Sequence, residues 1–302
     1  MTEPSTSHRS FTSRLLAHPT ARWSLGIIGV LIVAAALVPP FLGDACVRQD
    51  DIATLKNAAP SLKHWLGTDQ YSRDVFARLI CGARVSLSVA TLAVIMSMTL
   101  GTAIGLVAGY FGGRIDSVMM RVLDGFLSIP RVLLLLAVLT LWPVRLGGLI
   151  LLLGLTGWFG MSRLVRAETR IAAKQPYIEA ARALGASHMV ILFRHLLPNV
   201  IASITVAATL SIGNVIALEA GLSYLGIGAP EPNASWGSMF LDGVDFYAGN
   251  WWAVLFPGIT IVITVLSFNM LGDALRDVLD PRQVHVAHRL PELIVAERVK
   301  EA

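Results

Sequence analysis

The chain has 302 residues, of which 55% are hydrophobic and 15% charged, and its mean hydropathy is +0.66. Soluble proteins carry about 25% charged residues, so this composition excludes an ordinary soluble domain and predicts an integral membrane protein. The formal net charge of +4 would suit a nucleic acid partner, but the basic residues lie beside long apolar runs, as they do in membrane proteins. We therefore expect the chain to lie in a lipid bilayer and to bind no nucleic acid.

The first apolar run, Ser24 to Leu42, follows a polar segment of residues 1–23 and is closed by Pro39 and Pro40. This run is longer than the hydrophobic region of a signal peptide and starts late in the chain. Both features favour a retained membrane anchor over a cleaved signal.

A polar outer segment continues to Arg84, so residues 24–84 comprise the first span and this segment. Cys46 and Cys81 both lie here, with neither a CxxC motif nor a metal-binding spacing. The pair is compatible with a disulfide and equally with two free thiols.

The second predicted span, Val85 to Tyr110, contains Gly101, Gly105 and Gly109. A glycine at every fourth position puts all three on one helical face, where another helix can approach closely. The alternative is a general tolerance of small residues in lipid, but three glycines in register favour a helix contact.

Four more spans are predicted after an amphipathic stretch, RIDSVMMRVLDGFLSIP, that begins at Arg114. Residues 85–282 then form the core transmembrane domain, and residues 283–302 form a charged tail. We expect this tail to be an amphipathic surface helix and assign it no function. The four spans are Ile129 to Val144, Leu146 to Met161, Val200 to Leu222 and Trp251 to Leu271.

The distribution of Lys and Arg predicts the orientation of the six spans. With the N-terminus inside, the inner segments 1–23, 111–128, 163–198 and 273–302 hold sixteen of these residues. The outer segments 43–84, 145 and 222–250 hold seven. Both termini are therefore expected in the cytoplasm.

No motif for catalysis or cofactor binding is present in the sequence. It contains no GxxxxGK[ST] phosphate loop, no HExxH and no GxSxG. We expect a chain that is not an enzyme and holds no metal or cofactor.

The stretch EAARALGASHMVILFRHLLPN, which begins at Glu179, is a punctuated helical element on the predicted cytoplasmic side. Pro176 suits the first turn of a helix, and Glu179 favours the positive end of its dipole. Gly185 can end this helix in a left-handed cap, and Ser187 can cap a second helix that runs to Pro198. Such a knob suits a groove on another protein, although an ordinary loop with helical turns fits the pattern equally well. The second helix has an apolar face formed by Met189, Leu192, Phe193 and Leu196.

The same stretch resembles the EAA loop of ATP-binding-cassette importer permeases, in which a glycine follows the Glu by six residues and Leu-Pro ends the motif. His195 departs from this pattern, because its position is usually apolar. The resemblance implies that residues 175–198 form a coupling helix seated in a cytoplasmic ATPase subunit. The positions assigned to this coupling role are Glu179, Ala180, Ala181, Gly185, His188, Leu197 and Pro198.

A second stretch, LGTDQYSRDVFARLICGARVSLSVA, resembles the signature of C-type subunits of oligopeptide and dipeptide permeases. Ser72 stands where that signature usually has a glycine, which puts a backbone shape with positive φ in doubt. The resemblance covers residues 22–282. It implies an all-α membrane fold of six transmembrane helices, the type I importer permease fold.

The resemblance also implies partners and a location. These are a homologous second permease, two cytoplasmic ATPase subunits and an extracytoplasmic solute-binding protein that delivers a peptide, all at a bacterial plasma membrane. Nickel or glutathione import by the same machinery is an alternative. A stand-alone secondary transporter, which would show midplane charges and internal repeats, and a membrane scaffold are alternatives of another class.

Three polar residues of the fifth span are candidates for the solute pathway or its gate. Glu219 lies near the outer end of the span, where we prefer a structural or gating role to direct solute contact. Ser211 and Asn214 share a helical face, and they either line the pathway or, as we favour, make interhelical hydrogen bonds.

Two further assignments concern the membrane interfaces. Arg131 is expected at the inner interface with its head group in water. Trp236, Trp251 and Trp252 are expected in an outer aromatic belt.

Overall fold

The computed structural model describes residues 11–142, 145–229, 234–244 and 249–279. The secondary structure of these ranges is helical, apart from one isolated bridge between Thr68 and Asp74, which confirms the predicted all-α class. The predicted tail helix at 283–302 lies outside the described residues. In chain order the elements are α1 (Phe11–Ala17), α2 (Pro19–Leu37), α3 (Pro39–Leu42), η1 (Gly43–Cys46), α4 (Ile52–Leu55), α5 (Val75–Phe111), α6 (Gly113–Leu127), α7 (Arg131–Leu141), α8 (Leu146–Ala172), α9 (Pro176–Ala183), α10 (His188–Val190), η2 (Ile191–Leu196), α11 (Leu197–Tyr224), α12 (Trp236–Val244) and α13 (Trp251–Leu279).

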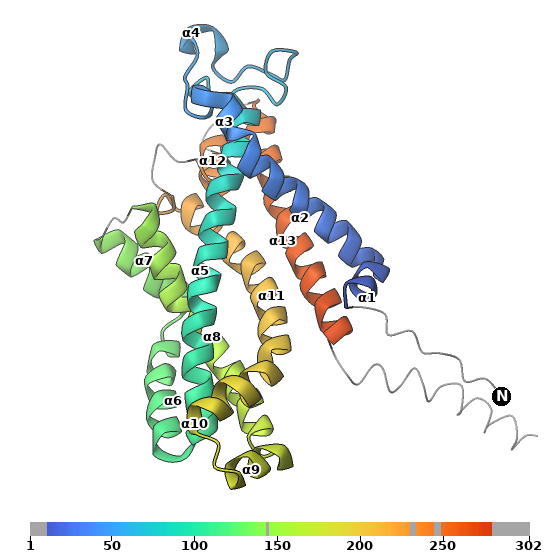
Figure 1. Cartoon of the computed structure of the whole chain (residues 1–302). Helices are drawn as coiled ribbons and strands as arrows, with labels where there is room; N and C mark the ends of the chain where they lie inside the picture. The colour runs from blue at the N-terminus through green and yellow to red at the C-terminus, as the bar shows by residue number, and fades with distance from the viewer. Residues whose placement is uncertain (1–10, 143–144, 230–233, 245–248, 280–302) are drawn as a thin grey trace, which may run out of the picture.

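The helices are arranged around α5, which runs along the length of the bundle (Figure 1). In this view α6 and α7 lie on one side of α5, and α2 and α13 lie on the other. The outer segment, residues 43–74, caps one end of the bundle, and α9 lies at the opposite end (Figure 1). The predicted outer segment and the predicted cytoplasmic loop are therefore separated by the full length of the molecule.

Within the described residues, five helices are long and apolar enough to cross a bilayer: α2, α5, α8, the continuous helix from His188 to Tyr224, and α13. The sixth span is reached only if α6 and α7, which meet at 71°, are taken as one bent span. The predicted third span, Ile129 to Val144, therefore began too late in the sequence to include α6. The 11 residues of α7 cover about 16 Å, roughly half of the hydrocarbon core of a bilayer, so α7 alone is too short. The break falls at Pro130, which cannot continue the preceding helix.

Several helices extend beyond their predicted apolar runs. α5 begins at Val75, because the Asp74 carboxylate accepts the amide of Ala77 at 2.8 Å and caps the helix there. With 37 residues α5 is about 55 Å long, well beyond the thickness of a hydrocarbon core. α8 continues to Ala172 because basic side chains favour a helix as well as apolar ones do. Hydropathy therefore located the apolar parts of α5 and α8 and missed their ends.

The glycine stripe of α5 forms a close contact with a neighbouring helix. A Cβ added at Gly101, Gly105 or Gly109 would lie 2.6 to 2.7 Å from the side chain of a residue on α8. These α8 residues are Met161, Val165 and Thr169, which share the same spacing of four. The predicted helix contact is confirmed, and its partner is the third of the long helices.

Arg131 makes contacts that the sequence did not predict. Its guanidinium donates from Nη2 to the carbonyl of Leu153 at 2.9 Å and from Nε to Thr156 Oγ1 at 3.2 Å. The head group is therefore bonded to α8, and the residue is half-buried. These bonds tie the short helix α7 to its neighbour.

The predicted aromatic belt is only partly formed. Trp251 is exposed, but Trp236 and Trp252 are buried. The indole of Trp236 donates to the carbonyl of Leu79 at 3.0 Å, and that of Trp252 donates to the carbonyl of Thr68 at 3.1 Å. The two buried rings fasten α12 and α13 to α5 and the outer segment, because a buried indole N–H needs an acceptor.

Candidate functional site

The loop after α8 folds as the sequence predicts in its first half. α9 begins at Pro176 and carries Glu179 exposed in its first turn. Its end is a Schellman motif: the amide of Ala186 donates to the carbonyl of Ala181, and that of Gly185 to the carbonyl of Arg182, both at 3.0 Å. Gly185 has φ +80°, so the predicted left-handed cap is confirmed.

The second half of the loop departs from the prediction at its far end. Ser187 caps α10 as predicted, since its hydroxyl accepts the amide of Val190 at 3.4 Å. The helix does not end at Pro198. A π-helical turn, η2, shifts the hydrogen-bond register so that Pro198 falls in the first turn of α11, where a missing N–H costs little. The helix therefore continues without a break from His188 to Tyr224.

One face of this loop is fixed to the bundle. Ile178, Ile191, Leu192 and Leu196 are buried in a common cluster with Val165 of α8 and other residues. This burial packs the loop against the ends of α5 and α8. The predicted apolar face of the second helix is thus split, because Leu192 and Leu196 point into the core.

A polar contact reinforces this attachment. Tyr110, in the last turn of α5, places its hydroxyl 2.8 Å from Nδ1 of His188. The guanidinium carbon of Arg182 lies 5.1 Å from the centre of the same ring, within the range of a cation–π interaction. Tyr110 thereby contacts both halves of the loop.

The opposite face of the loop is apolar and exposed. Leu184 is 89% exposed, Met189 63% and Phe193 57%. Large apolar side chains gathered on a short element, outside the described contacts of the chain, are typical of a protein interface. Ala180, Gly185 and Pro198 are exposed as well, while Ala181 and Leu197 are half-buried.

Glu219 is fully buried near the C-terminal end of α11. Its carboxylate accepts hydrogen bonds from Ser223 Oγ at 2.6 Å and Ser86 Oγ at 3.4 Å. The hydroxyls of Ser223 and Ser235 lie 3.2 Å apart. We call Ser86, Glu219, Ser223 and Ser235 the serine cluster. Burial favours the structural or gating role of Glu219 over direct solute contact, and that role stays a prediction.

Ser211 and Asn214 make no interhelical hydrogen bond within the described part of this chain, so the interhelical role that the sequence favoured stays a prediction. Ser211 Oγ donates to the carbonyl of Ala207 in its own helix at 2.7 Å. Asn214 is exposed, and in the described part of the chain its side chain makes no hydrogen bond. Its face of α11 is therefore free for a solute pathway or a partner helix.

The outer segment contains a buried ion network that the sequence did not reveal. The Asp69 carboxylate accepts Arg73 Nε at 2.7 Å and also pairs with Arg78 Nη1. Asp242, from α12, accepts Arg73 Nη2 at 2.9 Å and Arg78 Nη1 at 3.0 Å. We call these four residues the outer network. It ties the outer segment, α5 and α12 together, because breaking a buried pair would leave an uncompensated charge.

Ser72 adopts the backbone shape that the sequence put in doubt. Its φ is +60°, although it is not a glycine, and its side chain is fully buried. Its amide donates to the carbonyl of Asp69 at 3.0 Å, and its carbonyl accepts the amide of Asp50 at 3.3 Å. These bonds hold the turn that presents Asp69 to Arg73.

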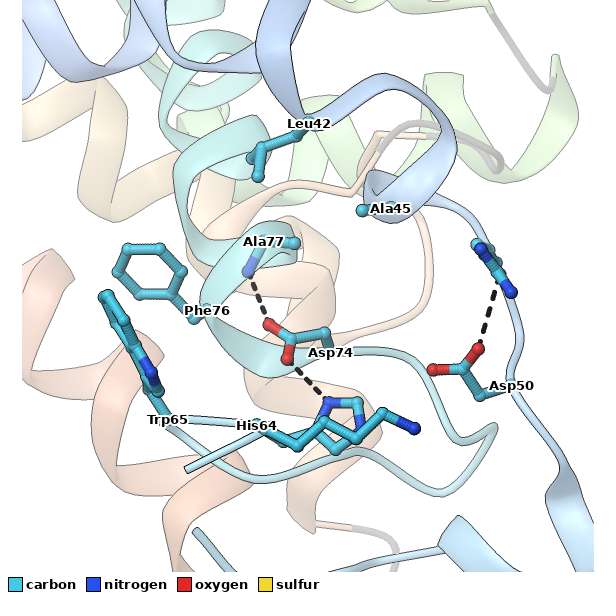
Figure 2. A pocket seen from close by; sticks show the side chains of 10 residues that line it. Leu42, Ala45, Asp50, His64, Trp65, Asp74, Phe76 and Ala77 are labelled. Atoms are coloured by element: carbon cyan, nitrogen blue, oxygen red, sulfur yellow. Dashed lines mark hydrogen bonds and ion pairs between the residues drawn. The ribbon is translucent and has the colours of Figure 1, made fainter. Parts of the chain in front are cut away.

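A pocket opens beside this turn. His64 and Asp74 lie at its floor, with Nδ1 of the imidazole 2.8 Å from the carboxylate (Figure 2). Trp65 and Phe76 form one side, with ring centres 5.3 Å apart. Asp74 thus caps α5 and holds the loop that precedes it.

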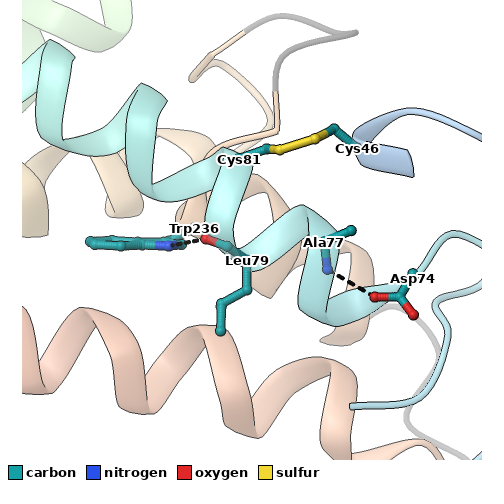
Figure 3. The surroundings of a disulfide bond; sticks show 6 residues. All are labelled: Cys46, Asp74, Ala77, Leu79, Cys81 and Trp236. Carbon is teal, nitrogen blue, oxygen red and sulfur yellow. Dashed lines mark hydrogen bonds between the residues drawn. A yellow bond between two sulfur atoms is a disulfide. The ribbon is translucent and has the colours of Figure 1, made fainter. Parts of the chain in front are cut away.

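Cys46 and Cys81 form a disulfide between the end of η1 and α5, with their Cα atoms 6.1 Å apart (Figure 3). Of the two alternatives left open by the sequence, the structure therefore has the disulfide. It links the chain leaving α2 and α3 directly to the second long helix.

Comparisons with known proteins agree with this architecture. The profile of a family described as "Binding-protein-dependent transport system inner membrane component" matches residues 101–285. The dipeptide transport system permease protein DppC of Bacillus subtilis is 40% identical over 270 residues, which are 89% of this chain and 84% of that protein. The oligopeptide permease protein OppC of the same organism is 38% identical, with 85% and 86% covered. The glutathione transport system permease protein GsiD of Pectobacterium atrosepticum is 36% identical, with 92% of each chain covered.

A solved structure of the MetNI methionine ABC transporter in an inward-facing conformation has a chain of the same fold. It superposes with a TM-score of 0.51 at 22% identity, covering 66% of this chain and 95% of that chain. The resemblance to importer permeases found in the sequence is confirmed. The chain belongs to the family of binding-protein-dependent transport system inner membrane components.

Proposed function

We propose that this chain is the transmembrane subunit of an ATP-driven peptide importer and that residues 175–198 couple it to a cytoplasmic ATPase. The observation that carries the proposal is the two-sided loop. One face is buried against α5 and α8, and the other presents Leu184, Met189 and Phe193 outward. A rigid, apolar knob of this kind suits a groove on a separate protein.

The loop is well placed to transmit motion. When ATP closes a pair of ATPase subunits, a knob seated in one of them moves with it. Because the helix from His188 to Tyr224 is continuous, about 55 Å long, a tilt at its cytoplasmic end displaces its outer end as well. This displacement would open the solute pathway alternately to the two sides of the membrane, while the chain itself hydrolyses no ATP.

The pathway would form against a homologous second permease. The exposed face of α11 that carries Asn214 offers polar groups to such a pathway, with Ser211 beside it. Delivery from outside would fall to an extracytoplasmic solute-binding protein, and both termini would lie in the cytoplasm of a bacterial plasma membrane. The basic residues near α8 and α9 support this orientation.

Peptides are the proposed solute, because two of the similar permeases transport dipeptides and oligopeptides by name. Glutathione is the second candidate, favoured by 36% identity to a glutathione permease protein across 92% of the chain. Uptake of labelled dipeptides, pentapeptides and glutathione by cells with and without the chain separates these candidates. Loss of glutathione uptake alone would contradict the peptide assignment.

The coupling assignment is tested by recovery of the ATPase subunits with the purified permease. We expect Glu179→Ala to weaken this association by about 1–3 kcal/mol, roughly 5- to 150-fold, if the exposed carboxylate makes a charged hydrogen bond across the interface. Asp273→Ala is the matched control, since Asp273 is an exposed acid on α13 outside the loop. Equal recovery of the ATPase with both variants would contradict the role of Glu179.

A further inference from the structure

Helix α12 is fastened by polar contacts at both of its ends, which are buried at its start and half-buried at Asp242. At its start, the amide of Trp236 donates to Ser86 Oγ at 3.2 Å, and Ser235 lies 3.2 Å from Ser223 in the serine cluster. At its other end, Asp242 joins the outer network through Arg73 and Arg78. α12 is therefore the helix that contacts both the serine cluster and the outer network.

Close packing gives α12 little freedom to move by itself. A Cβ added at Gly237 would lie 2.6 Å from the Cα of Ala220 on α11. One added at Gly243 would lie 2.8 Å from backbone atoms of Ala253 on α13. Backbones in such close contact must shift together, because a packed interior does not deform smoothly.

The serine cluster connects α12 to the helix that begins in the coupling loop. Glu219 stands on α11, and the continuous helix containing it starts at His188. The outer network connects α12 to the outer segment, whose surface carries the exposed side chains of Leu62 and Trp65. A displacement of the outer segment can thus reach the coupling loop through the outer network, α12, the serine cluster and the helix that starts at His188.

We propose that Asp242 and Glu219 are positioning residues for transport. When the solute-binding protein docks on the outer segment, they transmit the resulting displacement through α12 and α11 to the ATPase subunits. This inference rests on the proposed function and specifies how that function is regulated. Asp242 positions α12 relative to the outer segment, and Glu219 positions α11 relative to α12. Neither residue contacts the solute.

The test uses the complete transporter, reconstituted in lipid vesicles with its ATPase and binding-protein subunits. ATP hydrolysis is measured with and without the binding protein, and the ratio of the two rates is compared between variants. In Asp242→Asn we expect this ratio to fall about 5-fold or more, as for a typical coupling free energy, with the rate without binding protein unchanged. Asp44→Asn, an exposed acid of the same outer region, is the matched control and should leave the ratio unchanged.

A second variant tests the other joint without removing any charge. Ser235→Ala deletes one hydroxyl of the serine cluster, and Ser88→Ala on the exposed side of α5 is its control. We expect Ser235→Ala to lower the same ratio, and the double variant with Asp242→Asn to lower it no further than the stronger single change. Residues of one relay are not additive, whereas independent sites are.

The outcomes are distinct. A normal ratio in Ser235→Ala overturns the proposal, even if Asp242→Asn fails to assemble. An equal loss of both hydrolysis rates also overturns it, because it indicates a purely structural role. A wild-type transporter whose hydrolysis no binding protein stimulates contradicts the proposed function itself, and the relay falls with it.

Discussion

The hydroxyl of Tyr110, in the last turn of α5, lies 2.8 Å from Nδ1 of His188, the first residue of α10. This contact joins the longest described helices of the bundle at the end that carries the coupling loop. Tyr110 is nearly buried, whereas His188 is exposed. The bond therefore anchors an exposed element to a fixed one.

Tyr110→Phe removes this anchor and leaves the ring in place. The lost hydrogen bond is worth about 0.5–1.5 kcal/mol, so we expect ATPase association to weaken roughly 2- to 12-fold. Recovery of the ATPase with the purified permease measures this change. Tyr224→Phe, a half-exposed tyrosine at the outer end of α11, is the control. An equal loss of recovery in the two variants would mean that the contact does not support coupling.

The glycine stripe of α5 makes a prediction about stability. In Gly105→Ala the new Cβ would lie 2.7 Å from Val165 Cβ and 2.8 Å from the Ser162 carbonyl, so α5 and α8 must separate. Overpacking of this kind costs about 1–3 kcal/mol. We expect a lower melting temperature in detergent. Gly160→Ala on α8, whose added Cβ has no atom of the described ranges within 4 Å, should be neutral or stabilising. A Gly105→Ala protein as stable as the wild type would contradict the tight contact.

The disulfide predicts the labelling of the two cysteines. Because disulfides persist in oxidising compartments, the Cys46–Cys81 bond fits an outer segment outside the cytoplasm. A membrane-impermeant thiol reagent should label intact cells only after reduction. Cys46→Ser, which frees Cys81, should change mobility on a non-reducing gel without any change in size on a reducing one. Labelling of the wild-type protein without reductant would show that the thiols are free.

How much of the molecule could be predicted depends on the distance over which each signal acts. The caps at Gly185 and Ser187 were readable, because a left-handed glycine and an N-cap serine act on their own helix ends. The glycine stripe predicted a helix contact but not its partner, since spacing reveals a face and not what covers it.

Contacts between residues far apart in the chain could not be predicted from the sequence in this way. Asp242 lies 164 residues after Arg78, and nothing local to either residue indicates the pairing. The same holds for Trp236, whose indole finds an acceptor 157 residues earlier in the chain. From the sequence alone, its hydrophobic ring fitted a membrane interface as well as a buried core, and the structure shows that it is buried.

The orientation of the chain is predicted by its basic residues and can be tested with reporter fusions. Fusions after Gly43 and after Gly228 should be extracytoplasmic, and fusions after Arg170 cytoplasmic. The structure places the outer segment and α9 at opposite ends of the bundle, so the two groups of fusions must report opposite sides (Figure 1). A reporter after Arg170 that is active outside would reverse the orientation and remove the coupling assignment.

Gly185 is the position where the coupling loop is expected to be most sensitive. Its φ of +80° is unfavourable for a β-branched residue, and no atom of the described residues lies within 4 Å of an added Cβ. The cost of Gly185→Val within the chain is therefore backbone strain alone, of order 1–3 kcal/mol, in a surface loop that does not hold the bundle together. We expect the variant to insert normally and to lose solute uptake and ATPase recovery.

Gly226 provides a matched control for Gly185→Val. It has φ +79°, ends α11 in the same type of Schellman motif, and likewise has no atom of the described residues within 4 Å of an added Cβ. Gly226→Val carries the same strain at the opposite end of the bundle, so it should retain ATPase recovery. A third variant, Gly185→Asn, separates strain from contact, because asparagine tolerates a left-handed backbone but still adds a Cβ. If the ATPase approaches this glycine closely, Gly185→Asn loses recovery as well. Normal ATPase recovery and solute uptake in Gly185→Val would instead show that the loop does not transmit motion from the ATPase and that another part of the chain does.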